Sequence, residues 1–244
     1  MKYLLPLLCA TALLAQAETA QERGKRLIDE TIAALGGKAF LSVDNRVETG
    51  RAYSFYRDRM TGLAQATFYT QYVNAPDKPL EQRERQSFGK DEDYLILFLE
   101  DNGYQVTYRG AKPLLKDRWE RYVDSTRRNI FYILRKRLNE PGLIIEHIGT
   151  DVWQNTPVEK IRITDADNET VEVYLHRSTK LPVHQTYTKL DEKTKYRDTY
   201  SSLYSKYRDV GNGVQWPYNI ISFRNGDKTF EIFSESVTVN EPAR

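Results

Sequence analysis

Hydrophobic and polar residues alternate along most of the chain after residue 45. Within residues 47–56, Val47, Tyr53 and Phe55 fall on one side of an extended backbone, because successive strand side chains point to opposite faces. Similar runs follow, separated by turn residues such as Asn225-Gly226, the strongest hairpin signal in the chain. The pattern predicts about 11–12 short antiparallel strands, at residues 47–56, 65–73, 84–88, 93–100, 103–110, 143–149, 157–165, 170–176, 181–190, 195–210, 214–225 and 228–240.

Two segments have a helical period of three to four residues instead. The first, in residues 18–37, repeats apolar residues from Leu27 onward and ends at Gly36-Gly37, as a helix C-cap should. The second lies in residues 116–142, stops at Pro141-Gly142, and carries apolar side chains at Trp119, Tyr122, Val123, Ile130, Phe131, Leu134 and Leu138. The basic residues of this inserted helix suit its outer surface and its ends: Arg127, Arg128, Arg135, Lys136 and Arg137.

A dozen or so antiparallel strands with two helices form either a sandwich or a curved sheet wrapped around a helix. The second arrangement is favoured, because the inserted helix needs a concave apolar partner. We therefore expect a mainly β fold of the α+β class. Its curved antiparallel sheet forms an incomplete β-barrel, with the N-terminal and inserted helices covering the concave face. No repeat or long linker divides residues 18–244, which predicts a single domain. Pro217 cannot donate to a strand ladder, which favours an edge or a bulge there.

The N-terminal residues 1–17, MKYLLPLLCATALLAQA, have the pattern of a cleavable secretory signal. Lys2 precedes a short apolar run, and small residues at Ala15 and Ala17 predict cleavage after Ala17. No later segment approaches the roughly 20 apolar residues that a transmembrane helix needs. Cys9 lies inside the apolar run and does not fit a lipid-attachment site. We expect a secreted, soluble mature protein without a lipid anchor.

Charge and cysteine content argue against several classes of function. Lysine and arginine together number 36, and aspartate and glutamate 34. Such a balance gives no overall field that would favour nucleic acid or an anionic membrane. The single cysteine lies within the predicted signal, so the mature chain would have no disulfide, thiol chemistry or cysteine metal site. Tyrosine is the unusual excess, with 17 residues.

Motifs for catalysis and metal binding are scarce. The chain has no H-E-x-x-H, G-x-S-x-G, P-loop or G-x-G-x-x-G motif. His176 and His184 flank a turn where hairpin pairing could bring them together, but a zinc centre usually needs three or four ligands. Acidic pairs such as Asp165 and Asp167 lie in turns, which these residues favour. We predict no catalytic residue, no metal and no cofactor.

Aromatic residues are the remaining signal, since they recur at inward-facing steps of the predicted strands and of the inserted helix. Packing in the core explains such residues without any ligand. The lining of an apolar cavity explains them as well, and the sequence leaves both interpretations open. The candidate cavity-lining residues are Tyr53, Phe55, Phe68, Trp119, Tyr122, Phe131, Leu134 and Trp216.

The C-terminal part of the sequence resembles a known family. Three stretches carry the resemblance: VEVYLHRSTKLPVHQTYTKL, then SKYRDVGNGVQWPYNI, then NGDKTFEI. Their ordered features are a strand, a short turn, Leu181-Pro182-Val183, a polar hairpin, Tyr207-Arg208-Asp209-Val210, a glycine-bearing turn and Trp216-Pro217. Over residues 157–239 the chain thus resembles the LolA-type family of periplasmic carriers that sort outer-membrane lipoproteins. The N-terminal half agrees with this family in its layout.

The resemblance implies an incomplete β-barrel whose concave face, covered by helices, shelters the acyl chains of a lipoprotein or a related lipid. It also implies an inner-membrane exporter and an outer-membrane acceptor protein as partners. Arg51 is the nearest candidate for the arginine that helps to close the helical lid in family members. The chain is longer than the compact carriers, and related folds serve as envelope-stress sensors.

Three functional hypotheses follow from these observations. The leading one is a non-enzymatic periplasmic carrier or binding protein for a lipid or for lipoprotein acyl chains, which neither binds nucleic acid nor spans the membrane. The alternative is an envelope interaction or stress-sensor protein that uses the same fold as a docking surface. The third, a hydrolase of envelope material, rests only on scattered carboxylates and on His176 and His184.

Overall fold

One antiparallel sheet of 13 strands forms the body of the protein. The structure is a computed structural model that describes residues 17–90, 92, 94–191 and 195–241. Across the sheet the strand order is β6-β5-β4-β3-β2-β1-β13-β12-β11-β10-β9-β8-β7. The strands are β1 Asn45–Tyr56, β2 Arg59–Tyr72, β3 Gln82–Phe88, β4 Tyr94–Phe98, β5 Gly103–Thr107, β6 Gly110–Pro113, β7 Ile144–Trp153, β8 Thr156–Thr164, β9 Thr170–His176, β10 Pro182–Leu190, β11 Arg197–Asp209, β12 Gln215–Arg224 and β13 Asp227–Val239.

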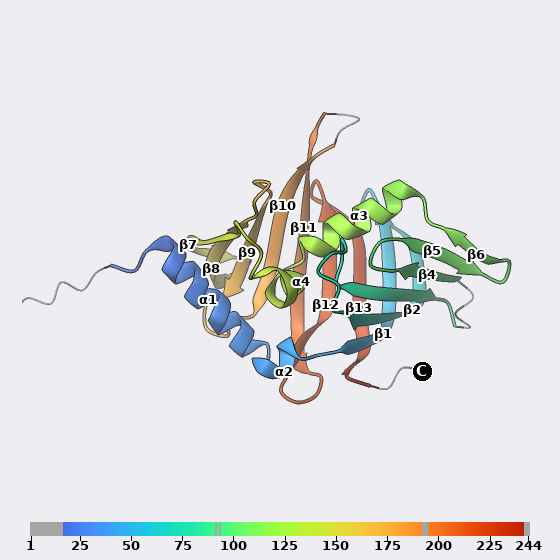
Figure 1. Cartoon of the computed structure of the whole chain (residues 1–244), viewed down its shortest axis with the longest axis horizontal. Helices are drawn as coiled ribbons and strands as arrows, with labels where there is room; N and C mark the ends of the chain where they lie inside the picture. Colours follow the sequence, from blue (N-terminus) through green and yellow to red (C-terminus); the bar gives the residue numbers. More distant parts are fainter. Residues whose placement is uncertain (1–16, 91, 93, 192–194, 242–244) are drawn as a thin grey trace, which may run out of the picture.

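The sheet is curved and does not close on itself (Figure 1). Strands β6 and β7 lie at its two ends, and in the described part of the chain they do not pair with each other. The predicted fold class, a mainly β chain with a curved antiparallel sheet in an incomplete barrel, is therefore confirmed. The structure has one strand more than the predicted 11–12. The additional strand is β6, a four-residue strand that begins where the predicted strand 103–110 ends.

Neighbouring strands in the sheet are also neighbours in the chain, with one exception. Strand β1 pairs with β13, in a register that runs from Arg46 opposite Val239 to Ser54 opposite Phe230. This ladder shifts register between Thr49 and Gly50, a β-bulge. The β1–β13 ladder thus joins the two hairpin series, β1–β6 and β7–β13, into a single sheet.

The helical segments are α1 Ala20–Ala34, α2 Lys38–Leu41, α3 Lys116–Arg127, α4 Ile130–Tyr132 and the π-helical turn η1 Ile133–Arg137. Figure 1 shows α1, α3 and α4 on the same side of the sheet. Helix α1 begins with a capping box, in which Thr19 N–H donates to Glu22 Oε2 over 2.8 Å and Glu22 N–H donates to Thr19 Oγ1 over 3.2 Å. A Cβ atom at Gly24 would lie 2.9 Å from the carbonyl oxygen of Ile145, so glycine permits the close approach of α1 to β7.

The inserted helix is not continuous, contrary to the prediction of one helix through residues 116–142. It breaks at Arg128 and Asn129, and Asn129 then caps a new helix by accepting a 2.9 Å hydrogen bond from Phe131 N–H. The asparagine side chain competes for backbone hydrogen bonds and so favours a cap over a helix interior. The break lets α3 lie on the surface, while α4 and η1 enter the core.

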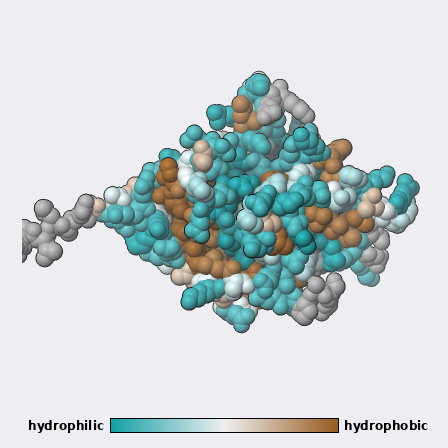
Figure 2. Space-filling model, viewed as in Figure 1, coloured by the Kyte–Doolittle hydropathy of each residue, from teal (hydrophilic) through white to brown (hydrophobic). Residues whose placement is uncertain are grey.

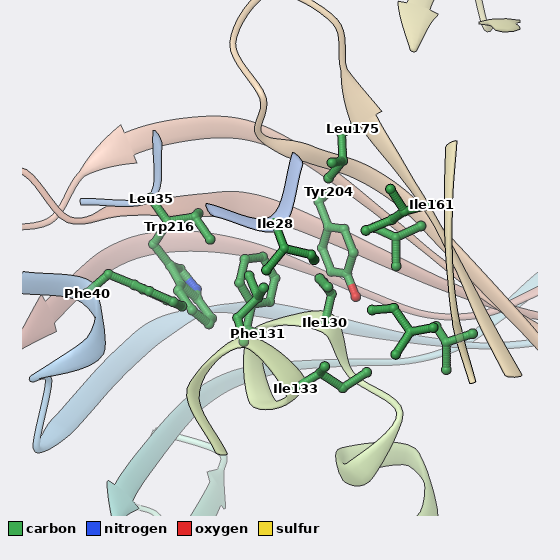
Figure 3. Packing of buried hydrophobic residues seen from close by; sticks show 14 of the residues in the cluster. Ile28, Leu35, Phe40, Ile130, Phe131, Ile133, Ile161, Leu175, Tyr204 and Trp216 are labelled. Atoms are coloured by element: carbon green, nitrogen blue, oxygen red, sulfur yellow. The ribbon is translucent and has the colours of Figure 1, made fainter. Parts of the chain in front are cut away.

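The main hydrophobic core lies between α1, α2, α4 and η1 on one side and strands β8–β13 on the other. Figure 3 shows Phe131 and Ile130 directed from the α4 segment toward Tyr204, with Trp216 and Ile28 close by. Leu134 belongs to the same cluster and is 2 % exposed. Close packing of these side chains fixes α4 and η1 against the sheet.

Several basic residues of the inserted segment are buried, contrary to the prediction that they lie on its outer surface. Arg128 is 8 % exposed and Arg137 is 4 % exposed. Arg137 donates to Glu140 and to Asp165, at 2.8 and 3.1 Å. The guanidinium of Arg135 donates to backbone carbonyl oxygens of α2 and of the turn that follows it. The buried guanidinium of Arg137 thus keeps two carboxylate partners, as burial of charge requires.

Strand β12 is interior to the sheet, contrary to the edge position that Pro217 favours. Its first half nevertheless has no ladder with β13 within the described residues. Pro217 lies opposite Tyr207 of β11, whereas the ladder with β13 begins only at Asn219. The missing N–H of proline is therefore tolerated, because that half of the strand has no β13 partner.

Most of the predicted signal, residues 1–16, lies outside the described residues. Among the residues that the structure describes, none of the helices has the length and apolar character to span a membrane.

Candidate functional site

A cleft of about 720 Å³ lies between the concave face of the sheet and the segment that contains α3 and α4. Its walls come from β1, β2 and β3 on one side and from β10, β11, β12 and β13 on the other. Because side chains alternate along a strand, many of the residues that reach the cleft are two positions apart, such as Tyr200, Ser202 and Tyr204 of β11. The open barrel therefore produces a concave site at the middle of the sheet.

Aromatic rings make up much of the cleft lining. Phe131 packs against Trp216 with ring centroids 4.7 Å apart and against Tyr204 at 5.1 Å. Burial raises the pKa of Tyr204, so its hydroxyl stays protonated and able to donate. The aromatic lining residues are Tyr72, Tyr122, Phe131, Tyr132, Tyr187, Tyr200, Tyr204, Trp216, Phe223 and Phe230. These rings provide apolar faces together with polar hydroxyl groups.

The wall formed by β1, β2 and β3 is polar. Arg46 donates through Nη2 to Thr70 Oγ1 at 3.2 Å, and Thr70 Oγ1 donates to Glu84 Oε2 at 3.3 Å. The other carboxyl oxygen of Glu84 accepts from Gln86 Nε2 at 2.6 Å. All four side chains line the cleft, and burial raises the pKa of Glu84. A half-buried acid beside hydroxyl and amide groups is thus part of the site.

Helix α3 covers part of the cleft through Tyr122. The Tyr122 ring stacks on Phe98 with centroids 3.6 Å apart, and its hydroxyl accepts from Gln82 Nε2 at 2.9 Å. None of the residues of α3 is fully buried, and Figure 2 shows a mostly hydrophilic surface over this helix. Helix α3 is therefore less deeply buried than α4, whose three residues are all buried, and we expect α3 to open more easily.

The eight sequence-predicted residues lie in different places. Tyr122, Phe131 and Trp216 line the cleft. Phe68 lies at its border, since its ring contacts the cleft residue Phe230 edge-on at 6.5 Å. Leu134 is in the closed core.

Tyr53 and Phe55 are on the opposite face of β1 from the cleft residue Arg46, because odd and even positions point apart. Tyr53 contacts Phe233 edge-on at 6.1 Å, and Lys228 Nζ lies 4.3 Å from the centroid of Phe55.

Trp119 lines a separate groove of about 620 Å³ on the other side of α3, together with Val123 and Lys189. A further groove of about 380 Å³ runs beside α1 and includes Ile144 and Ile145. Figure 2 shows hydrophobic surface gathered along α1. Neither groove contains the polar wall of the main cleft.

Arg51, the candidate for the lid-closing arginine, points away from the cleft. It donates to Glu235 at 3.2 Å, and its side chain is 59 % exposed. The arginine of β1 that faces the cleft is Arg46, which the sequence analysis did not select. Arg46 and Glu48 both occupy even-numbered positions of β1. They would have been candidates if the even-numbered face of β1, and not the odd-numbered face, had been taken as the inward one.

The two hairpin histidines, His176 and His184, make different contacts. His176 Nδ1 accepts hydrogen bonds from the backbone N–H groups of Ser178 and Thr179, each at 3.2 Å. His184 stacks on Trp153 with ring centroids 4.7 Å apart. Within the described part of the chain, no group of three or more potential metal-ligating residues is found. The two histidines give the hydrolase hypothesis no assembled site.

Comparisons with known proteins identify the fold. No family model matches the chain, and no curated protein matches its sequence. Many solved structures match, and three of them illustrate the likeness. A domain described as an outer membrane lipoprotein-sorting protein, from Vibrio parahaemolyticus, is 10 % identical with a TM-score of 0.61, covering 92 % of this chain and 95 % of its own.

The second is a DUF1329 family protein from Desulfovibrio piger, at 9 % identity and a TM-score of 0.60, with 91 % of this chain and 95 % of that one covered. The third is a LolA superfamily protein from Nitrosomonas europaea, at 8 % identity and a TM-score of 0.56, with 90 % and 94 % covered. These likenesses define a class of fold, the half-open barrel with helices on its concave side. The chain has a LolA-like fold.

Proposed function

We propose that this protein is a periplasmic, non-enzymatic carrier or binding protein for a lipid or for lipoprotein acyl chains. The bound molecule lies in the cleft between α3 and the sheet, against the half-buried rings of Tyr200, Phe223 and Phe230. The observation that carries the proposal is this cleft, an aromatic-lined concavity in a barrel that is not closed. The LolA-like fold supports it, because one matched structure is described as a lipoprotein-sorting domain.

The size of the cleft supports a ligand of lipid dimensions. Pockets for small molecules typically enclose about 300–1,000 Å³, and the cleft encloses about 720 Å³. Shielding an acyl chain is worth about 0.8 kcal/mol per methylene, so a chain of about 16 carbons costs on the order of 12 kcal/mol to expose. The aromatic faces of the lining are the surfaces that would replace water around such a chain.

Release of a bound chain requires the cleft to open. The contacts of Tyr122 with Phe98 and Gln82 hold α3 over the site, whereas α4 and η1 are fixed in the core. Movement of α3 about the break at Asn129 would expose the cleft without disturbing the main core. An exporter in the inner membrane and an acceptor in the outer membrane are the partners proposed for loading and release.

Lipid extraction from the natively purified protein tests the proposal directly. Organic extracts examined by mass spectrometry are expected to contain a lipid or lipopeptide in stoichiometric amount. After delipidation, the protein is expected to bind a fluorescent fatty acid whose signal is displaced by unlabelled lipid. Absence of both a co-purified lipid and probe binding would contradict the carrier proposal.

Two variants on one strand test whether the ligand binds in the cleft. Ser202→Trp on β11 introduces a bulky ring into the cleft and is expected to abolish probe binding. Thr199→Trp lies on the same strand, is exposed, and points to the opposite face, so it serves as the matched control. Equal loss of binding in both variants, with both still folded, would show that the probe is not bound in the cleft.

The envelope interaction or stress-sensor role is the second candidate. The groove on the other side of α3, with Trp119 and Val123, favours it, because it presents a half-buried aromatic residue away from the lipid cleft. Crosslinking in cells separates the two roles. A stable protein partner recovered with a lipid-free protein would favour docking, whereas bound lipid with only transient partners would favour carriage.

A further inference from the structure

The polar wall of the cleft is a connected set of hydrogen-bonding groups. Thr70 Oγ1 stands between Arg46 and Glu84, accepting from the first at 3.2 Å and donating to the second at 3.3 Å. Gln86 completes the row with its 2.6 Å bond to Glu84. The row crosses from β1 over β2 to β3, because Arg46 lies opposite Thr70 and Thr70 lies opposite Glu84 in the strand registers. The cross-strand pairing therefore builds the wall.

The cationic charge of this wall is offset by a neighbouring carboxylate. The guanidinium of Arg46 has Glu48 Oε2 at 3.7 Å from its Nε, and the side chains of the pair are 11 % and 4 % exposed. Glu84 faces the cleft from β3, and its burial raises the pKa of the carboxyl, which favours the protonated acid. A buried cation is thus offset by Glu48, while Glu84 contributes both a donor and an acceptor when protonated.

The available hydrogen bonds select among ligand head groups. A phosphate or carboxylate offers acceptors only and would lie against the carboxyl group of Glu84, while the charge of Arg46 is already offset by Glu48. An ammonium group offers donors only and would lie against Arg46. A hydroxyl group both donates and accepts, so it satisfies Thr70, Glu84 and Gln86 together.

The Arg46 side chain also keeps unused donor capacity. Its Nε–H is buried and lacks a hydrogen-bond partner, and its bond to the Tyr72 hydroxyl is long, at 3.4 Å. A pure hydrocarbon chain lying against this wall would leave Arg46, Glu84 and Gln86 without solvent or new partners, which is unfavourable for buried polar groups. The acyl part of a ligand therefore belongs on the aromatic side of the cleft, and its polar end belongs here.

We propose that the β1–β3 wall of the cleft is a subsite for a neutral, hydroxyl-rich head group, such as glycerol or a sugar, of the lipid that the protein carries. The inference rests on the proposed function and adds the chemical class of its ligand. Thr70, Glu84 and Gln86 bind the hydroxyl groups, and Arg46 donates to an oxygen atom of the same group. The Tyr72 and Tyr122 rings supply the apolar surfaces that pack against its C–H groups.

Amphiphiles that share one acyl chain test the subsite. Displacement of a fluorescent fatty acid from the delipidated full chain is measured with monolauroylglycerol, laurate, dodecyl phosphate and dodecylamine, each below its micelle concentration. Monolauroylglycerol is expected to bind at least about tenfold more tightly than each charged analogue. Equal affinities would overturn the head-group inference and leave the carrier proposal standing. Failure of all four compounds and of the probe to bind would contradict the carrier proposal itself, and the inference with it.

Variants of the wall assign the preference to these residues. Glu84→Ala and Gln86→Ala are expected to reduce the preference for monolauroylglycerol to less than about threefold, with laurate affinity retained. Glu84→Gln keeps a donor and an acceptor and is expected to preserve most of the preference. Glu235→Ala, on the opposite face of the sheet and 49 % exposed at its side chain, is the matched control.

Thermal unfolding of each variant establishes that it is folded before binding is compared. If Glu84→Ala does not fold, the comparison of Glu84→Gln with Gln86→Ala carries the test. An unchanged preference in folded Gln86→Ala and Glu84→Ala protein would overturn the assignment of the subsite to this wall.

Discussion

The guanidinium carbon of Arg46 lies 3.9 Å from the centroid of the Trp216 ring. Strand β1 thereby contacts the first half of β12, with which it shares no ladder, since β13 lies between them in the sheet. Both side chains of the stacked pair line the cleft, and Phe131 packs on the same indole. The guanidinium of Arg46 is thus held in place by Trp216, an aromatic residue of the core.

A double-mutant cycle on this pair measures its coupling. Arg46→Met, Trp216→Leu and the double variant are expected to give an interaction free energy of about 2 kcal/mol, because the pair is largely removed from water. The cycle on Arg208 and Tyr218 is the control, since Arg208 stacks on Tyr218 at 4.5 Å from an exposed position. Chemical denaturation gives the free energies. A coupling no larger than that of the control pair would contradict a structural role for the Arg46 contact.

Gly50 is required where β1 passes the bulge in its ladder with β13. A Cβ atom at this residue would lie 2.2 Å from the carbonyl oxygen of Phe233, so the backbone would have to move. Gly50→Ala is expected to lower the free energy of unfolding by about 1–3 kcal/mol. At Gly62 the nearest atom would be 3.7 Å away, in Ser54, and Gly62→Ala is expected to change stability by less than about 0.5 kcal/mol. Similar losses in both variants would contradict the close approach.

Leu134 and Trp119 are expected to respond differently to truncation. Leu134 is 2 % exposed in the core cluster, so Leu134→Ala should cost about 2–5 kcal/mol. Trp119 is only partly buried on α3, and its stack on Phe98 has centroids 6.4 Å apart, so Trp119→Ala should cost less than about 3 kcal/mol. Urea denaturation compares the two. Loss of about 4 kcal/mol or more at Trp119 would show that α3 is part of the cooperative core.

The stability of the fold is expected to depend on His184 below neutral pH. Burial lowers the pKa of His184 from 6.5 to about 4, so the unfolded chain binds more protons than the folded one between these two values. The free energy of unfolding therefore falls as the pH is lowered through this window and is unaffected by this residue above it. The contribution is on the order of 2 kcal/mol, given the partial exposure of the ring.

Denaturation of the wild type and of His184→Gln at pH values across that window measures this contribution. The variant is expected to lose less stability toward low pH than the wild type does. His176→Gln is the control, because His176 Nδ1 accepts turn N–H groups and lies on the other strand of the hairpin. Parallel curves for the wild type and His184→Gln would contradict the assignment.

The sequence predicted the architecture better than the site. Alternation identified the strands because the core face of the sheet is continuous, as at Ile161 and Val173, which are fully buried. The helix break at Asn129 was missed, since the apolar spacing continues across it and the cap depends on a side-chain bond that spacing does not reveal.

The face of β1 was assigned by its rings, Tyr53 and Phe55, whereas the concave face of that strand carries Arg46 and Glu48. A hydrophobic pattern marks the inward face of a strand only where that face meets a core. Along the cleft the inward face meets water or a ligand, so polar residues stand there. From its sequence alone, the β1–β3 wall therefore has the pattern of a solvent-exposed surface. It lines a cleft because the sheet is curved, and the hydrophobic pattern does not reveal that curvature.

The β1–β13 ladder has a consequence for how the chain reaches its native state. Every other strand pair forms between sequence neighbours and can zip from a hairpin turn, so two meanders can assemble independently. The junction of β1 and β13 must instead bring together segments near opposite termini, at the full entropic cost of closing a loop of almost the whole polypeptide. Pairing of β1 with β13 would then be the late step that limits the folding rate. The cleft has walls from both meanders, so it would become able to bind a ligand only after this step.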